Sequence, residues 1–279
     1  MSKSFQAVSE YENTLMVVDA LNLAFRWKHT GATDFAEDYK RTVDSLRKSY
    51  KAKWVIITAD QGSSSYRKNI YPEYKQNRKD KFAEQTDAEK AAFELFFEDY
   101  QKTLDYLREC GYPVLQFKQT EADDIAAYIS SVANQYPVEH IWLISSDKDW
   151  DLLVSDTVSR FSYVTRKEVT ANNWHTHYDF PHEDYISVKC LMGDTGDNVI
   201  GVEGIGPKRA KALVEEFGTA LDIVAALPIQ SKLKYVKALN DSGDKIMLNY
   251  QLMDLVTFCR DALGDNTQQI DQILETYLK

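Results

Sequence analysis

The chain has 279 residues, 44% hydrophobic and 27% charged, a composition typical of a soluble globular protein with one large domain or two modest ones. It contains no apolar run of about 18 residues, which argues against a membrane span, and its polar N-terminus lacks the apolar stretch of a signal peptide. The formal net charge of −10 argues against a nucleic-acid partner, but binding depends on local potential, so charge placement can reverse that inference.

The three cysteines are far apart and have no metal-binding spacing: Cys110, Cys190 and Cys259. They indicate reduced thiols in an intracellular, cytoplasmic protein. Three histidines near residue 180 also lack the partners of a zinc site, so we interpret them as surface-loop residues: His175, His177 and His182.

Four apolar runs predict buried strands: "TLMVVDALN", "KWVIITADQGSSS", "YPVLQFKQ" and "HIWLISSDKDWDLL". Helical stretches separate them, which predicts an α/β fold with a parallel-sheet core flanked by helices. After the third run, Thr120 is expected to cap a helix whose first turn is acidic. Carboxylates lie at or just beyond the C-terminal end of each run, the edge where open α/β sheets bind ligands.

Between the second and third runs, residues 62–110 form a long insertion that begins with basic and aromatic residues. On a helix, Lys75, Arg78 and Lys79 would share one face. Cations interleaved with aromatic rings suit a single strand of nucleic acid; the alternative is a solvated charged face, which we favour for Lys79 and Lys81. A later stripe at helical spacing predicts ordinary core packing against the sheet: Phe93, Phe96, Phe97, Tyr100, Leu104 and Leu107.

Beyond residue 180 the strand signals fade and the chain is expected to be mainly helical. "GVEGIG" precedes a helix with Pro207 at its first position and Gly218 just past its end. Glycines and a helix N-terminus suit close approach of a phosphate, and Lys208, Arg209 and Lys211 add positive charge. The alternative is an ordinary connection between two helices with solvated lysines.

Nine acids fall at the ends of predicted elements: Asp19, Asp60, Glu121, Asp123, Asp124, Asp147, Asp149, Asp194 and Asp197. If they converge, only protons or cations can offset their repulsion, and oxygen-only ligands favour Mg²⁺ or Mn²⁺ over zinc. Such a set matches two-metal phosphodiester hydrolysis. For any single acid the better interpretation is a turn residue. Setting the nine aside leaves 34 acidic against 33 basic residues, so the remaining surface could carry cationic tracks for a phosphate backbone.

Five segments in family order resemble the structure-specific 5′ nucleases: "VVDALNLAFR", "YRKNIYPEYKQNR", "TEADDIAAYI", "ISSDKDWDLL" and "LMGDTGDNVIGVEGIGPKRA". This family includes the flap endonucleases and the 5′-nuclease domain of bacterial DNA polymerase I, and the similarity is greatest to the bacteriophage 5′→3′ exonucleases. The resemblance implies a PIN-like sheet core, a helical arch and a helix–three-turn–helix. It also implies hydrolysis of 5′ flaps and 5′ ends of DNA with two or more Mg²⁺ or Mn²⁺ ions.

The resemblance assigns roles to individual residues. All nine acids match metal-site positions, with Glu121, Asp123, Asp124 and Asp147 in the tighter site and Asp194 and Asp197 in the second. The residues implied in catalysis are Lys75, Arg78 and Asp147. Those implied in DNA binding are Arg26, Arg67, Tyr74, Lys75, Arg78, Lys189, Lys208 and Arg209. We further expect a monovalent cation at the hairpin and a monomer without membrane contact in a phage-infected bacterial cell.

The expected organisation is a nuclease core over residues 1–182, with the arch at 62–110, and a helical DNA-binding region over 183–279. The latter would contain a helix–hairpin–helix at about 185–218, while the last 60 residues match the family only loosely. Two other functions remain possible from the residues alone: a nuclease that removes RNA primers from RNA–DNA hybrids, and a structure-specific DNA-binding protein without turnover.

Overall fold

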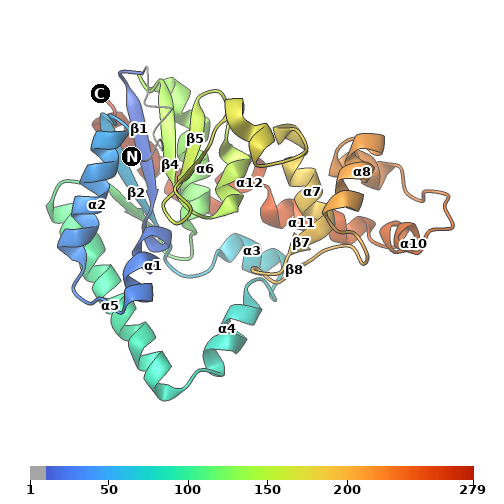
Figure 1. Cartoon of the computed structure of the whole chain (residues 1–279), viewed down its shortest axis with the longest axis horizontal. Helices are drawn as coiled ribbons and strands as arrows, with labels where there is room; N and C mark the ends of the chain where they lie inside the picture. The colour runs from blue at the N-terminus through green and yellow to red at the C-terminus, as the bar shows by residue number, and fades with distance from the viewer. Residues whose placement is uncertain (1–10) are drawn as a thin grey trace.

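A computed structural model describes residues 11–279 and has a six-stranded sheet at its centre (Figure 1). The sheet order is β3-β2-β1-β4-β5-β6, and every neighbouring pair is parallel except β5 and β6. The strands are β1 (Thr14–Asp19), β2 (Trp54–Ala59), β3 (Val114–Gln116), β4 (His140–Ile144), β5 (Val158–Ser162) and β6 (Lys167–Val169). The predicted α/β class and parallel core are confirmed.

The sequence predicted the first four strands but missed β5 and β6. β5 is fully buried although it contains Ser159, Arg160 and Ser162. Burial is possible because the guanidinium of Arg160 forms an ion pair with Asp151 and donates to the Ser145 carbonyl at 2.9 Å. A buried charge that is paired in this way gives no apolar signal in the sequence.

Helices cover both faces of the sheet, because alternate strand residues point to opposite sides. Met16 and Val18 belong to a core with α1 (Ala20–Thr30), α2 (Ala36–Ser49) and the C-terminal part of α5 (Asp87–Glu109). Leu15 and Val17 belong to the opposite core, which includes residues of α6 (Ala122–Val132), α12 (Leu255–Leu263) and α13 (Asn266–Tyr277). The last helices therefore return to the sheet, and the Tyr277 hydroxyl accepts a hydrogen bond from the Val55 amide at 3.2 Å.

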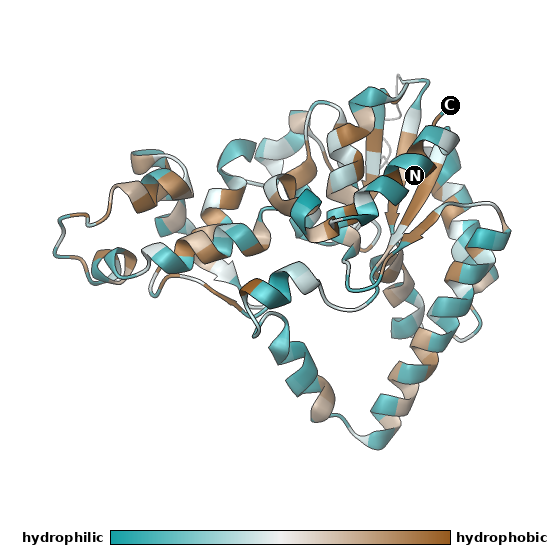
Figure 2. Cartoon of the chain, turned by 180° about the vertical axis from the view of Figure 1, so that it is seen from behind, coloured by the Kyte–Doolittle hydropathy of each residue, from teal (hydrophilic) through white to brown (hydrophobic). Residues whose placement is uncertain are grey.

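The insertion after β2 forms α3 (Ser65–Ile70), α4 (Gln76–Ala83) and α5, and the last two meet in a V at the bottom of Figure 1. In α5, Phe96, Tyr100, Leu104 and Leu107 are buried as predicted. Phe93 and Phe97 are only half-buried, because this part of the helix extends beyond the sheet. Figure 2 shows hydrophobic colour concentrated in the strands and hydrophilic colour over much of both limbs of the V.

After the sheet the chain is mainly helical, as expected, with its own core. Two short helices lie within the sheet region: η1 (Ala133–Gln135) before β4, and η2 (Lys148–Leu153) between β4 and β5. The elements that follow β6 are η3 (Ala171–Thr176), η4 (His182–Asp184), α7 (Tyr185–Met192), β7 (Gly193–Asp194), β8 (Val199–Ile200), α8 (Pro207–Phe217), α9 (Ala220–Ala225), α10 (Lys234–Asn240) and α11 (Gly243–Met253). Pro207 begins α8 and Gly218 ends it, as the sequence predicted. Between residues 11 and 279, no helix is long and apolar enough to cross a membrane.

Candidate active site

The C-terminal end of β1 places the first acid of the site. Asp19 is the last residue of β1 and the N-cap of α1. Its Oδ1 accepts a hydrogen bond from the Asn22 amide at 3.1 Å, and its Oδ2 accepts one from the Ser145 hydroxyl, just after β4, at 2.7 Å. Two neighbouring strands therefore hold this carboxylate in one orientation.

Asp60 follows β2 and caps a helix from another part of the chain. Its Oδ1 accepts a hydrogen bond from the amide of Ala122, the first residue of α6, at 2.7 Å. The prediction that Thr120 caps this helix is wrong: Glu121 occupies the N-cap position and its side chain makes no capping bond. Asp60 supplies the capping oxygen instead, which links β2 to the acidic start of α6.

Two further acids are oriented by the segment after β4. Asp147 is the N-cap of η2, and its Oδ1 accepts a hydrogen bond from the Asp149 amide at 2.9 Å. In η2, Trp150 is buried and its indole Nε1 donates to Oδ1 of Asp123 at 2.6 Å. This bond fixes the Asp123 carboxylate on the first turn of α6.

The hairpin of β7 and β8 contributes the last two acids. Oδ1 of Asp194 accepts hydrogen bonds from the amides of Gly196 and Asp197, at 2.8 and 3.3 Å, so the tight turn is closed by its own carboxylate. Asp197 lies beside the base of the arch, where its Oδ2 is 2.9 Å from the hydroxyl of the buried Tyr74.

Seven aspartates and two cations line a single open pocket of about 260 Å³: Asp19, Asp60, Asp123, Asp147, Asp149, Asp194, Asp197, Lys75 and Arg78. Burial, with the nearby charges of Asp60 and Asp147, raises the pKa of Asp19 to about 7. Burial and the same two neighbours also raise the pKa of Asp123. Carboxyl groups with raised pKa values lack enough positive charge around them.

Lys75 lies between the carboxylates and the arch. It is at the N-cap of α4 in the left-handed region, with φ of 55°, and its amide donates to the Asp197 carbonyl at 2.9 Å. This conformation is uncommon outside glycine, and it directs the chain away from α3 into α4. Its Nζ is 2.7 Å from Oε1 of Glu121 and 3.6 Å from Oδ2 of Asp197.

Two other cations tie the hairpin to α4 and to the segment after β4. Arg78 forms an ion pair with Asp197 and its Nε donates to the Gly196 carbonyl at 3.2 Å. Lys189 forms an ion pair with Asp149 and lies 3.4 Å from Oδ2 of Asp194. The cations thus offset part of the acidic charge and tie α4 and α7 to the same pocket.

The donor set fits hard divalent ions, because the pocket offers carboxylate oxygens and neither cysteine nor histidine. Between residues 11 and 279, however, no three His, Cys, Asp or Glu side chains are already close enough together to hold one ion. Lys75, Arg78 and Lys189 instead pair with several of the acids. Binding of an ion by Asp149, Asp194 or Asp197 would therefore require that carboxylate to turn from its cationic partner.

Two acids of the expected metal set do not line this pocket. Both carboxylate oxygens of Asp124 bind the guanidinium of Arg67, at 2.7 and 2.8 Å, and Asp124 is fully buried. Glu121 is 3% exposed and accepts hydrogen bonds from Arg67, Tyr74 and Lys75. Burial raises the pKa of Glu121, but Lys75 and Arg67 outweigh it and hold that pKa below its usual value.

Arg67 and Tyr74, expected to contact DNA, are 2% and 3% exposed. The Nε of Arg67 donates to the Leu252 carbonyl in α11 at 2.8 Å, and its other guanidinium nitrogens bind Glu121 and Asp124. In this conformation neither side chain can reach a nucleic acid. Both instead connect the arch base with Glu121.

Replacing Arg67 with Met should destabilise the protein by about 3–5 kcal/mol, because Asp124 would remain buried without a partner. Urea unfolding followed by circular dichroism would measure the loss. The double variant Arg67→Met/Asp124→Leu should recover much of the stability. A single variant as stable as the wild type would contradict the structural role of this pair.

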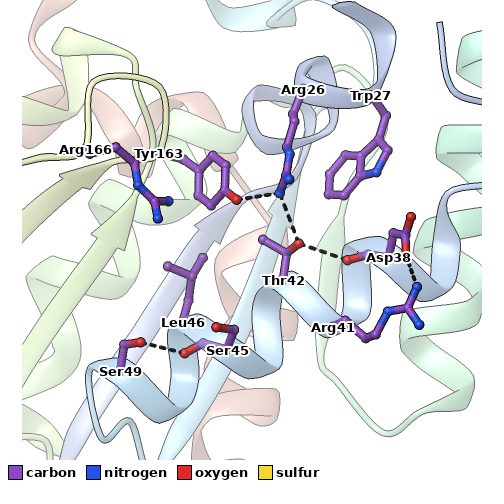
Figure 3. A pocket seen from close by; sticks show the side chains of 10 residues that line it. All are labelled: Arg26, Trp27, Asp38, Arg41, Thr42, Ser45, Leu46, Ser49, Tyr163 and Arg166. Atoms are coloured by element: carbon purple, nitrogen blue, oxygen red, sulfur yellow. Dashed lines mark hydrogen bonds and ion pairs between the residues drawn. The ribbon is translucent and has the colours of Figure 1, made fainter. Parts of the chain in front are cut away.

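Arg26 lies in a separate pocket of about 330 Å³ lined by residues of α1 and α2 and of the turn after β5 (Figure 3). Its guanidinium hydrogen-bonds the Tyr163 hydroxyl and lies 3.5 Å from Oγ1 of Thr42. Arg41 and Arg166 line the same pocket. Among the residues that the structure describes, Arg26 pairs with no carboxylate, so its charge is available to an external anion.

Lys208 and Arg209 are exposed at the first turn of α8. Nη1 of Arg209 donates to the Gly204 carbonyl at 2.6 Å and its guanidinium stacks on the Tyr235 ring. Both cations lie beyond the hairpin, outside the carboxylate pocket. Lys189 is largely enclosed by its two acidic partners.

Sequence reasoning missed residues that line or orient the pocket. Asn22 and Phe25 face it from α1, and Trp150 orients Asp123. Asn22 follows Asp19 by three residues at a helix start, a spacing that could have indicated it. Trp150 lies inside "DKDWD" but gives no sign of its direction, because a buried tryptophan is normally a core residue.

Comparisons with known proteins agree with this geometry. Residues 14–179 match the family model for the 5′-3′ exonuclease N-terminal resolvase-like domain, and residues 180–272 match that for the 5′-3′ exonuclease C-terminal SAM fold. The chain belongs to the 5′-3′ exonuclease family. It is therefore a structure-specific 5′ nuclease, a hydrolase, as its sequence predicted.

Among the relatives of this 5′ nuclease, the flap endonuclease of Escherichia phage T5 is 43% identical over 97% of the chain and 95% of the relative. Flap endonuclease Xni of Aeromonas hydrophila is 27% identical over 92% of this chain and 94% of that relative. A solved T5 5′-exonuclease with bound zinc has a TM-score of 0.91 at 41% identity and covers 96% of this chain and all of that one. A T5 flap endonuclease pseudo-enzyme-product complex with DNA and metal ions has a TM-score of 0.88 at 42% identity. The match covers 94% of this chain and all of that one.

Proposed function

We propose that this 5′ nuclease hydrolyses phosphodiester bonds at 5′ flaps and free 5′ ends of DNA, using two or more Mg²⁺ or Mn²⁺ ions. The observation that carries the proposal is the pocket where seven aspartates meet Lys75 and Arg78. The T5 relatives solved with divalent ions and with DNA support the same conclusion.

The proposed metal ligands are the seven aspartates of the pocket. Glu121 could join them if Lys75 left its carboxylate, whereas we reassign Asp124 to orienting Arg67. Ions held by these oxygens would activate a water and stabilise the leaving oxygen. The protein contributes a fixed acidic edge: Ser145 orients Asp19 and Trp150 orients Asp123.

Lys75 and Arg78 would bind the scissile phosphate. Both line the carboxylate pocket from α4, and both have charges that a phosphate could attract away from Asp197. In the transition state they would neutralise charge on the phosphoryl oxygens. Releasing Asp197 in the same step would free a carboxylate for a cation, so phosphate and metal binding should favour one another.

The flanking backbone would be held on both sides of this pocket. Lys208 and Arg209 at the helix start would contact duplex phosphates, and Arg26 would contact the backbone beyond α1. The 5′ single strand would pass the arch formed by α4 and α5. Lys189 would act by holding Asp149 and Asp194 in place. The monovalent cation expected at the hairpin stays a prediction.

We further infer a division near residue 182 between the nuclease core and the helical DNA-binding region, supported by adjoining family models that meet at residues 179 and 180. The phage T5 relative supports a place in a phage-infected cell. The cytoplasmic location and the monomeric state stay predictions.

Labelled flap substrates test the proposal. A 5′-flap DNA should be cut with Mg²⁺, left uncut in EDTA and cut again when Mg²⁺ is restored in excess. A nuclease specialised for primer removal would instead prefer an RNA flap of the same sequence. A protein that binds the flap but cuts it with neither Mg²⁺ nor Mn²⁺ would contradict the catalytic proposal.

Replacing Lys208 with Glu should weaken duplex binding and reduce the slope of log K against log salt by about 1, because one phosphate contact is lost. Fluorescence anisotropy at several salt concentrations measures this slope. The control Lys51→Glu makes the same charge change before β2, at the opposite edge of the sheet, and should leave the slope unchanged. An unaltered slope for Lys208→Glu would mean that α8 does not contact phosphate.

A further inference from the structure

The hairpin that carries Asp194 and Asp197 is not part of the central sheet. β7 and β8 pair with one another in a separate two-stranded sheet, whereas Asp19, Asp60 and Asp147 lie at the ends of central strands or just beyond them. Strand pairing in the central sheet therefore does not set the distance between the two groups of acids. Contacts made by the hairpin itself must set it.

The two arms of the hairpin meet backbone to backbone at a pair of glycines. Gly193 has φ of 71°, and a Cβ on it would collide with the backbone of Gly201 and Val199. A Cβ on Gly201 would collide with the Met192 carbonyl. Glycine permits both the positive φ and this close approach. The stem of the hairpin is therefore narrow and offers mainly backbone groups to whatever anchors it.

A buried amide from α11 binds both arms of this stem. Asn249 is 1% exposed, and its Nδ2 donates to the Cys190 carbonyl at 2.8 Å and to the Ile200 carbonyl at 3.0 Å. Cys190 lies in the last turn of α7, where carbonyls lack an intrahelical partner, and Ile200 pairs with Gly193 in the hairpin. The two hydrogens of one NH₂ group are thus used on the two arms.

α11 is also joined to the acidic start of α6. One turn after Asn249, the Leu252 carbonyl accepts a hydrogen bond from Arg67 at 2.8 Å. Arg67 in turn binds Glu121 and Asp124. α11 packs against both α7 and β8 (Figure 1). One helix therefore connects the sheet side of the carboxylate pocket with the stem of the hairpin.

The bonds of Asn249 differ from the ion pairs at the hairpin in one respect. Lys189 and Arg78 hold the hairpin through Asp194 and Asp197, and those carboxylates would have to leave their cations in order to bind a metal. Asn249 binds backbone carbonyls, so its hydrogen bonds need not break when an ion arrives. It can therefore keep the hairpin in place in the metal-loaded protein.

We propose that Asn249 is a positioning residue that holds Asp194 and Asp197 at the distance needed to share divalent ions with the acids of the central sheet. The inference rests on the proposed function and deepens it, because it concerns how the second metal site is kept in register with the first. Asn249 does not line the carboxylate pocket, so it acts through the backbone of α7 and β8. Its loss should weaken ion binding without removing a ligand.

Binding of Mn²⁺ alone tests this role without any cleavage, because the electron paramagnetic resonance signal of free Mn²⁺ reports how much is bound. The wild type should bind a tighter and a weaker ion. Asn249→Ala should weaken binding of the weaker ion about tenfold, as the loss of a group behind a metal ligand does, and leave the tighter ion unchanged. Wild-type affinities in Asn249→Ala, or an equal loss for both ions, would overturn the proposal.

The matched control is Asn240→Ala. The Asn240 amide also makes two hydrogen bonds to backbone, at 2.8 and 2.9 Å, but both go to Ile229 in the loop between α9 and α10. This variant should bind Mn²⁺ as the wild type does. The same loss of the weaker ion in Asn240→Ala would mean that general loosening of the helical region explains the effect, and would contradict a specific role for Asn249.

A second variant keeps the test valid if Asn249→Ala does not fold. Asn249→Leu retains most of the side-chain volume and removes the donors, so it should weaken the weaker ion by a similar factor. Circular dichroism would establish that the variant is folded. A folded Asn249→Leu protein with wild-type Mn²⁺ affinities would also overturn the proposal.

Single-turnover cleavage at increasing Mg²⁺ gives a further readout. Asn249→Ala should need about tenfold more Mg²⁺ for its half-maximal rate and should approach the wild-type rate at saturation, because every ligand is still present. A rate that stays low at saturating Mg²⁺ would contradict a positioning role. If the wild type binds both Mn²⁺ ions but never cuts DNA, the proposed function fails, while Mn²⁺ binding still tests Asn249. If the wild type cuts DNA and Asn249→Ala responds to both metals as the wild type does, the positioning role alone fails.

Discussion

Replacing Asp147 with Asn should reduce flap cleavage by more than about 100-fold while leaving flap binding intact. Removing a group that only hydrogen-bonds a metal ligand already lowers metal affinity or activity by about 10- to 100-fold. Asp147 is proposed to bind the metal directly, so its loss should cost more. Asn can still cap η2 through its side-chain oxygen, so the local fold should persist. Removing a negative charge should not weaken attraction to a polyanion. Single-turnover cleavage in Mg²⁺ and anisotropy binding in Ca²⁺ measure the two effects.

The matched control for this variant is Asp156→Asn, the same chemical change at an exposed residue just before β5. It lies at the opposite edge of the sheet from the carboxylate pocket and should cut normally. An Asp147→Asn protein that keeps most of its activity would show that the carboxylate after β4 does not hold a catalytic ion.

Replacing Lys75 with Ala should slow cleavage by about 100- to 1,000-fold, the usual cost of removing one group that stabilises transition-state charge. Lys75 bonds Glu121 and lies 3.6 Å from Asp197, so its charge is already directed at the pocket. Flap binding should weaken much less, because the phosphate contacts proposed for α8 and Arg26 are unchanged in this variant. Rates at saturating enzyme separate the chemical step from binding.

Lys81→Ala is the control for Lys75→Ala. It removes the same charge from an exposed position farther along α4 and should have little effect on the rate. If Lys75→Ala lost only affinity, with normal cleavage at saturation, Lys75 would bind DNA without acting in catalysis.

The net charge of −10 is explained by where the acids lie. Seven aspartates gather in one pocket, and cations such as Arg26 and Lys208 remain exposed around it. An acidic protein can therefore offer a cationic surface to DNA, because attraction depends on the local potential.

The sequence predicted the parts of the site that follow from topology. Asp19, Asp60 and Asp147 lie at the C-terminal ends of parallel strands, and parallel strands place those ends at one edge. Asp194 and Asp197 were predicted from their place after a predicted helix, and the resemblance assigned them to the second metal site. These positions depend on chain order and element type, both of which the sequence pattern contains.

Side-chain direction could not be predicted in the same way. Asp123 and Asp124 are adjacent on α6, yet the helical rotation turns the first toward Trp150 and the carboxylate pocket and the second toward Arg67. The buried role of Arg67 depends on Leu252, 185 residues later, and no local pattern contains that contact. β5 was missed for the same reason, because its arginine is paired only in the folded chain.

Anomalous diffraction from crystals soaked in Mn²⁺ most directly tests whether these acids form a metal site. Peaks are expected between the ends of β1, β2 and β4 and the β7–β8 hairpin, within coordination distance of carboxylate oxygens and accompanied by movement of Lys75 or Lys189 away from them. Manganese found elsewhere, with Asp149, Asp194 and Asp197 still paired to Lys189, Lys75 and Arg78 in a protein that cuts DNA, would contradict the account.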